Sequence, residues 1–123
     1  MLEPVNYEDY LNTLKQNPYY ADRWPYYAEA IKQTMEFKPN TCLELGTWDF
    51  PLFKNSIPMN QQSCKMGGVI HDARKTPWPF ENKQFDIFMA LQVFEHLDGH
   101  QSKIFEEVKR VARRAIISLP LEW

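Results

Sequence analysis

Long apolar runs, cysteine and basic charge are all in short supply in this sequence, and each shortage excludes a class of protein. No apolar run approaches the roughly 20 residues that a membrane-spanning helix needs, and the N-terminus shows no basic stretch followed by an apolar one. We therefore expect neither a membrane protein nor a secretory signal. The two cysteines, Cys42 and Cys64, lack the C-x-x-C spacing of redox and zinc motifs, so we expect two reduced thiols in a cytoplasmic protein.

Charge and composition further limit the class of protein and its partners. The chain has 14 Lys and Arg against 16 Asp and Glu, a net charge of −2, whereas nucleic-acid-binding proteins usually present a basic face. The balance therefore argues against nucleic acid as a partner. Hydrophobic residues make up 44% and charged residues 24%, which excludes a disordered chain and predicts a globular one. A length of 123 residues predicts one domain, 1–123.

Two helices are predicted in residues 1–40. Asn6 is a suitable N-cap for the first, because Asp9 follows three residues later as in a capping box. Asp22 is expected to cap the second, with Pro25 in its first turn, where a missing N–H costs least. Four tyrosines gather in this region: Tyr19, Tyr20, Tyr26 and Tyr27. They would form an aromatic lid over a pocket, part of a dimer interface, or ordinary helix-to-sheet packing.

Residues 41–120 alternate apolar strands with an amphipathic helix and make up the predicted α/β core. Short apolar runs predict strands at 41–45, 67–71, 85–91 and 115–119, with a short edge strand at 56–59. A helix is predicted over 100–114, with basic residues in its last turn: Lys109, Arg110, Arg113 and Arg114. Strands that alternate with helices imply a mostly parallel sheet. We therefore predict four or five mostly parallel strands with flanking helices, with 41–45 and 85–91 adjacent at the centre.

A candidate site follows from this architecture. Ligands of an open parallel sheet bind beyond the carboxyl ends of its strands, where the strand order reverses. The residues expected at that edge come directly after the strands, at 44–48, 71–73 and 90–92. This argument gives the place of a site but not its reaction.

Three segments resemble the motifs of the class I S-adenosylmethionine (SAM)-dependent methyltransferases, in the same order along the chain. LELGTWDF at 43–50 is similar to the family's first motif, an acidic residue followed by a glycine turn after the first strand. HDARKTPWPFENKQFDIFMALQVFEHL at 71–97 is similar to the later motifs. HQSKIFEEVKRVARRAIISLP at 100–120 is similar to the next helix and the fifth strand. The resemblance covers about residues 40–120 and implies a Rossmann-like fold.

The resemblance also implies a SAM site. Gly46 would let the backbone pass close to the methionine part of the cofactor, and Glu44 would orient the loop or meet the cofactor's ammonium group. Asp72 would accept a hydrogen bond from the adenine amine, with the small Ala73 beside the ring. Asn60 stands where the family commonly has an acid that holds the ribose hydroxyls, and an amide lacks the strength that the charge provides.

Four further positions complete the implied site. Leu91 and Gln92 would close the other side of the adenine, while Thr47 follows the glycine in the loop. Trp48 would either stack on the ligand or plug the pocket. The aromatic residues of TPWPF, at 76–80, are expected to pin a loop by packing rather than to contact substrate.

Two departures from the family pattern shape the functional hypotheses. Gly46 is the single glycine of a loop that is usually glycine-rich, and the chain stops after its fifth strand, without the usual C-terminal hairpin. The first hypothesis is a SAM-dependent methyltransferase whose acceptor the sequence does not identify. The alternative is a non-catalytic or truncated methyltransferase-like domain that acts as an interaction module or subunit.

The remaining expectations concern partners, metals and catalytic groups. A sheet edge without a covering hairpin predicts a homodimer, formed through the last strand or through the aromatic N-terminal helices. His96 and His100 are four residues apart, but Asp98-Gly99 lies between them, so no metal site is assigned. A metal-dependent hydrolase that adds His71 to these two histidines remains a third hypothesis. No catalytic residue is assigned, and His96 is weighed as a general base against a histidine that the backbone satisfies.

Overall fold

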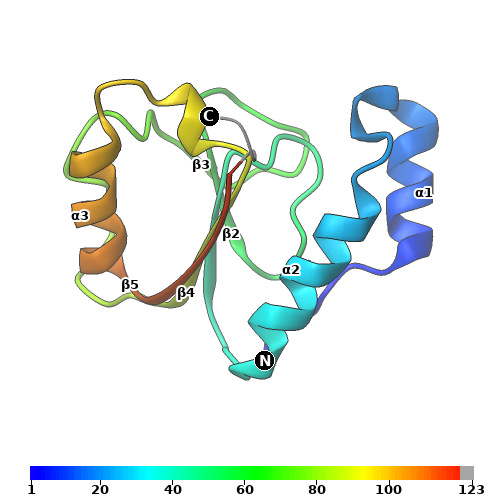
Figure 1. Ribbon diagram of the computed structural model, residues 1–123, viewed down its shortest axis with the longest axis horizontal. Helices are drawn as coiled ribbons and strands as arrows, with labels where there is room; N and C mark the ends of the chain where they lie inside the picture. The colour runs from blue at the N-terminus through cyan, green and yellow to red at the C-terminus, as the bar shows by residue number, and fades with distance from the viewer. Residues whose placement is uncertain (120–123) are drawn as a thin grey trace.

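The structure, a computed structural model, describes residues 1–119. Its elements follow the chain in the order α1 (Tyr7–Gln16), η1 (Pro18–Tyr20), α2 (Trp24–Glu36), β1 (Cys42–Leu45), β2 (Ile57–Asn60), β3 (Val69–Ile70), β4 (Phe85–Leu91), η2 (Phe94–His96), α3 (Gln101–Val111) and β5 (Ala112–Ser118), where η denotes a 3-10 helix. Figure 1 shows α3 on one face of the sheet and the pair α1 and α2 on the other. None of the helices within the described residues is long and apolar enough to cross a membrane.

The five strands form one parallel sheet in the order β3-β2-β1-β4-β5. β1 and β4 are adjacent at its centre, with Leu43 opposite Phe88. The predicted α/β, Rossmann-like fold and its central strand pair are therefore confirmed. The chain moves outward from β1 to β3 and then crosses back to β4, so the strand order reverses between β1 and β4. That reversal is where an open parallel sheet binds ligands.

The central strands are buried on both faces, which explains their continuous apolar sequences. Phe88 packs into the layer beneath α3, together with Ile104 of that helix. Its neighbours Ile87 and Met89 point the other way, into the layer that α1 and α2 cover. All three β4 side chains are 0–1% exposed, so one strand fills two hydrophobic layers.

The predicted N-terminal helices are present, but one of their caps is not. Asn6 and Asp9 form the capping box of α1, each side chain accepting from the other's backbone N–H at 2.9 Å. Pro25 lies in the first turn of α2 as predicted. The prediction for Asp22 was wrong, because Arg23 occupies the N-cap position and makes no side-chain capping bond. Asp22 instead has a φ of 61° in the turn that reverses the chain ahead of α2.

The start of one strand and the position of another in the sheet also differ from the sequence prediction. β5 starts at Ala112, paired with Phe85 of β4, so Arg113 and Arg114 lie in a strand rather than in the last turn of α3. The long β4 offers pairing partners for this whole run, and its ladder overrides the local helical pattern. The short strand predicted at the sheet edge is internal, because β2 pairs with both β1 and β3. Two-residue β3 takes the edge position instead.

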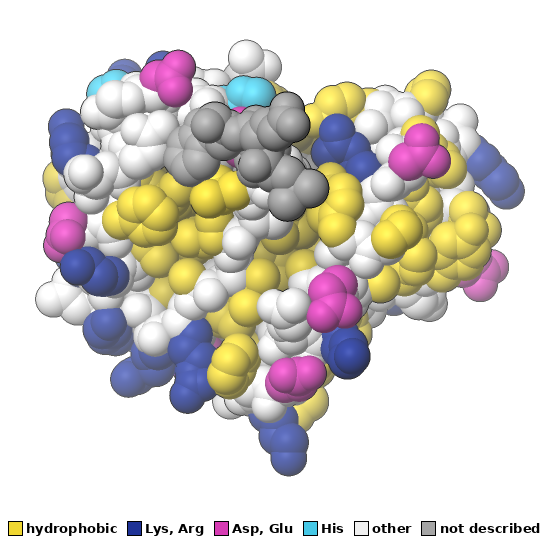
Figure 2. Space-filling view, viewed as in Figure 1, with side chains coloured by type: hydrophobic (Ala, Val, Ile, Leu, Met, Phe, Trp, Pro, Cys, Tyr) yellow, Lys and Arg dark blue, Asp and Glu magenta, His cyan; other side chains and the backbone are white. Residues whose placement is uncertain are grey.

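The opposite edge of the sheet is β5. Within residues 1–119 no further strand follows it. Figure 2 shows hydrophobic side chains gathered between α3 and the α1–α2 pair on the face where β5 runs. Phe105 of α3 and Phe37 at the end of α2 are 41% and 49% exposed, so this edge is flanked by exposed aromatic side chains.

Candidate functional site

A cavity of about 730 Å³ lies at the carboxyl ends of β1, β2 and β4. Its volume is in the range of small-molecule binding sites. The nine residues singled out from the sequence all line it: Glu44, Gly46, Thr47, Trp48, Asn60, Asp72, Ala73, Leu91 and Gln92. The fold thus brings together positions that are up to 48 residues apart in the chain.

The loop after β1 forms the floor of the cavity. Gly46 has a φ of 71°, and a Cβ at this position would lie 2.8 Å from a methyl carbon of Val93. A side chain at position 46 would therefore clash with Val93, in the segment after β4. Trp48 also has a positive φ, of 53°, and its N–H donates to Asn60 Oδ1 at 3.0 Å. Trp48 is 42% exposed and lies on the cavity wall.

Glu44 is buried at the base of this loop and holds it in place. Its carboxylate accepts hydrogen bonds from the backbone N–H groups of Leu52 at 2.8 Å and Phe53 at 3.1 Å, and from the Ser56 hydroxyl. Burial raises the pKa of Glu44 to about 7, although the three hydrogen bonds oppose the shift. Glu44 was expected either to orient the loop or to meet the cofactor's ammonium group, and these contacts are those of a residue that orients the loop.

Three buried polar atoms on the cavity wall have no hydrogen-bond partner among the described residues. They are Thr47 Oγ1, Asn60 Nδ2 and Glu95 Oε2. Asn60 lies at the end of β2 with 3% of its surface exposed, and only its amide oxygen is occupied. Buried polar groups are nearly always paired in folded proteins. These atoms therefore mark places where a bound molecule or water would complete the hydrogen bonding.

Asp72 is already engaged in a local turn. Its carboxylate accepts from the Arg74 backbone N–H at 3.0 Å and from the Arg74 guanidinium at 2.8 and 3.0 Å. The Arg74 hydrogen bonds hold the pKa of Asp72 well below its usual range. The next residue, Ala73, is buried, and its carbonyl accepts from the Trp78 indole at 2.9 Å. Trp78 is 2% exposed and pins this loop, as its sequence context predicted.

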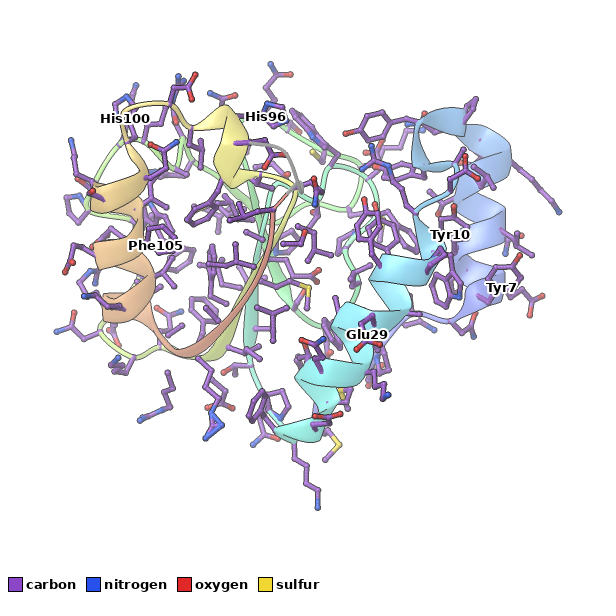
Figure 3. All side chains as sticks on the ribbon, in the orientation of Figure 1. Tyr7, Tyr10, Glu29, His96, His100 and Phe105 are labelled. Atoms are coloured by element: carbon purple, nitrogen blue, oxygen red, sulfur yellow. The ribbon has the colours of Figure 1, made fainter. Side chains whose placement is uncertain are left out.

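The segment after β4 closes the cavity. Gln92 has a φ of 57°, and its N–H donates to Ser118 O at 3.1 Å, which joins it to the end of β5. Glu95 and His96 in η2 also line the cavity, with Glu95 Oε1 3.5 Å from His96 Nε2. In Figure 3 His96 stands at the top of η2, and it is 77% exposed. His71 lines the cavity too, whereas His100 does not. Within residues 1–119 no cluster of three or more His, Cys, Asp or Glu is placed to hold a metal ion.

The N-terminal segment supplies a further wall. It consists of Tyr19, Tyr20, Arg23, Tyr26 and Tyr27, here called the tyrosine–arginine wall. Tyr20 and Tyr27 are 2% and 7% exposed, and Tyr20 Oη accepts from the Asp49 N–H at 3.1 Å. The tyrosines were interpreted as a lid over a pocket, part of a dimer interface, or helix-to-sheet packing. Their contacts show that they pack in the interior and also lie on the cavity wall. Arg23 was missed by sequence reasoning, and its position between two tyrosine pairs was the only signal.

Residues 50–115 match the methyltransferase domain family. This segment is just over half of the 123-residue chain, and it carries β2, β3, β4 and α3 of the parallel sheet. The chain therefore belongs to this family and is a member of the class I SAM-dependent methyltransferases. No curated protein and no solved structure matches it.

Proposed function

We propose that the chain binds SAM in this cavity and transfers its methyl group to an acceptor. One observation carries the proposal. The nine positions that the family motifs imply line a single cavity where the strand order reverses. Two of them, Thr47 and Asn60, present buried polar atoms without a protein partner. A cofactor rich in hydroxyl, amine and carboxylate groups fits such a wall.

The proposed roles follow from the contacts of each residue. Asn60 Nδ2 is free to donate to a ribose hydroxyl, while Oδ1 holds the loop through Trp48. Asp72 retains acceptor capacity for an adenine amine beside its bonds to Arg74, because a carboxylate accepts about four hydrogen bonds. The cofactor supplies an electrophilic methyl group, and the chain contributes mainly alignment of that group with the acceptor. A cytoplasmic location is part of the proposal and is supported by the two free cysteines.

A specific observation favours the alternative of a non-catalytic interaction module. The carboxylates of Glu44 and Asp72 both accept hydrogen bonds from protein groups, so neither of these two side chains needs a ligand as a partner. In that case the β5 edge, flanked by Phe37 and Phe105, is the surface through which we propose self-association as a homodimer.

Binding of S-adenosylhomocysteine (SAH), measured by calorimetry and thermal shift, separates the two functions. The parent chain is expected to bind SAH, and the absence of binding at millimolar SAH would overturn the enzyme proposal. Thr47→Val removes a hydroxyl that has no protein partner. We therefore expect SAH binding about three- to tenfold weaker with no loss of folding stability.

Thr34→Val provides the matched control. Thr34 also has a buried, unpartnered hydroxyl, but it lies on α2 and does not line the cavity. The variant is expected to bind SAH as tightly as the parent. Equal effects of the two substitutions would show that SAH, if it binds, does so elsewhere.

A further inference from the structure

The tyrosine–arginine wall is built by a part of the chain that the family match does not include. Its residues lie between 19 and 27, whereas the match covers 50–115. The cavity therefore has one wall of strand ends and one wall that lies outside the family match. The chemistry of the second wall is independent of the family motifs.

The backbone of this wall is fixed by buried contacts. Asn17 caps η1 by accepting from the Tyr19 N–H at 3.0 Å. The buried Tyr10 hydroxyl donates to Tyr20 O and accepts from the Arg23 N–H at 3.3 Å. Figure 3 shows Tyr10 on α1, facing the segment that leads into α2. The turn that carries Arg23 is thus held from the interior of the protein.

The guanidinium of Arg23 is also held in place. It lies 4.2 Å from the centre of the Tyr19 ring, Nε donates to Tyr19 O at 3.1 Å, and Nη1 donates to Tyr26 Oη at 3.1 Å. The Tyr27 hydroxyl is a further side-chain hydrogen-bond partner of the guanidinium, but Arg23 forms no ion pair with the described residues. Arg74, the other arginine on the cavity wall, is neutralised by Asp72 at 2.8 Å. Within residues 1–119, Arg23 is therefore an oriented cation without a counter-ion, set among aromatic rings.

From this arrangement we infer that the tyrosine–arginine wall is the acceptor subsite, and that it selects a small aromatic acceptor bearing a carboxylate. The inference rests on the proposed function. A guanidinium binds a carboxylate through parallel N–H donors, and tyrosine rings pack against a planar ring. The carboxylate of the cofactor's own amino-acid part presents the same chemistry, so the experiment must separate the two sources.

The probes are benzoate, its neutral isostere benzamide, and SAH, titrated by ligand-observed NMR and calorimetry. The parent chain is expected to bind benzoate in preference to benzamide, and to bind it equally well when saturated with SAH. Arg23→Gln is expected to weaken benzoate binding by about tenfold. Benzamide and SAH binding should stay within about twofold of the parent. The thermal midpoint of the variant checks that it is folded.

Arg114→Gln is the matched control, because Arg114 also stacks on an aromatic ring, 4.3 Å from the centre of Phe37, but lies outside the cavity. It should leave benzoate binding unchanged. Three results would overturn the inference: equal binding of benzoate and benzamide, competition between benzoate and SAH, or loss of SAH binding in Arg23→Gln. Failure of the parent to bind SAH would instead overturn the proposed function, whatever benzoate does.

Discussion

The helical pair α1–α2 and the family-matched segment that follows it are stabilised by different side chains. In the matched segment, aliphatic and phenylalanine side chains such as Phe88 and Ile104 fill the layer between the sheet and α3. In the helical pair and in η1 between its helices, tyrosines surround one residue of the matched segment. Phe50 lies 6.0, 5.9 and 5.8 Å from the rings of Tyr10, Tyr20 and Tyr27. The helical pair thus packs against the matched segment through its tyrosines, and this packing forms the tyrosine–arginine wall of the cavity.

The largest effects are expected from substitutions that distinguish these two layers. Phe88→Ala and Phe50→Ala each delete a buried phenylalanine, at 0% and 6% exposure, and each should lower the free energy of unfolding by about 3–5 kcal/mol. Phe50→Ala should in addition expose residues 1–40 to proteolysis under native conditions, because its ring is the contact that the tyrosines share. Denaturant unfolding and limited proteolysis measure the two effects. Equal protection of 1–40 in both variants would contradict the docked arrangement.

A smaller and pH-dependent effect is expected where β1 meets the matched segment, at Glu44. Its pKa in the folded state, about 7, lies above the ordinary value of 4.5. The folded state therefore holds the proton more tightly than the unfolded state. The associated stability is fully present below pH 4.5 and is lost as the pH rises to about 7, by about 3 kcal/mol.

Urea unfolding between pH 5 and 7 tests this expectation. The parent should lose stability across the range, and Glu44→Gln should abolish most of that slope. Glu107→Gln is the control, because hydrogen bonds from Arg110 lower the pKa of Glu107. That group titrates below the range, so its removal should leave the slope unchanged. A parent whose stability is flat from pH 5 to 7 would contradict the raised pKa.

These contacts show which parts of the fold were readable in the sequence. The parallel sheet was predictable because strands buried on both faces have uninterrupted apolar sequences, as in β4. The start of β5 was not, because Arg113 and Arg114 fit a helix locally and only the pairing with β4 makes them a strand. The internal place of β2 was hidden for a related reason, since a four-residue run does not reveal how many neighbours it has.

The candidate site shows the same division. Residues that follow strands were predictable, because parallel strands end at one edge. The contacts of these residues were not predictable. The hydrogen bonds from the Arg74 guanidinium to Asp72 and the close approach of Val93 to Gly46 depend on how the loops pack in three dimensions. Arg23 had no motif at all. Its place on the cavity wall follows from the docking of the helical pair.

The smallest effect is expected from the charged contact between the two regions. Lys54 Nζ lies 3.6 Å from Asp9 Oδ2, with the side chains 52% and 35% exposed. Water and salt screen an ion pair of this kind, and holding the long Lys54 side chain in one position costs entropy. Lys54→Met should therefore change the free energy of unfolding by less than about 0.5 kcal/mol, and residues 1–40 should stay protected from proteolysis. If the substitution released the helical pair as Phe50→Ala is expected to, the docking would depend on charge rather than on the aromatic cluster, and the contrast between the two regions would have to be redrawn.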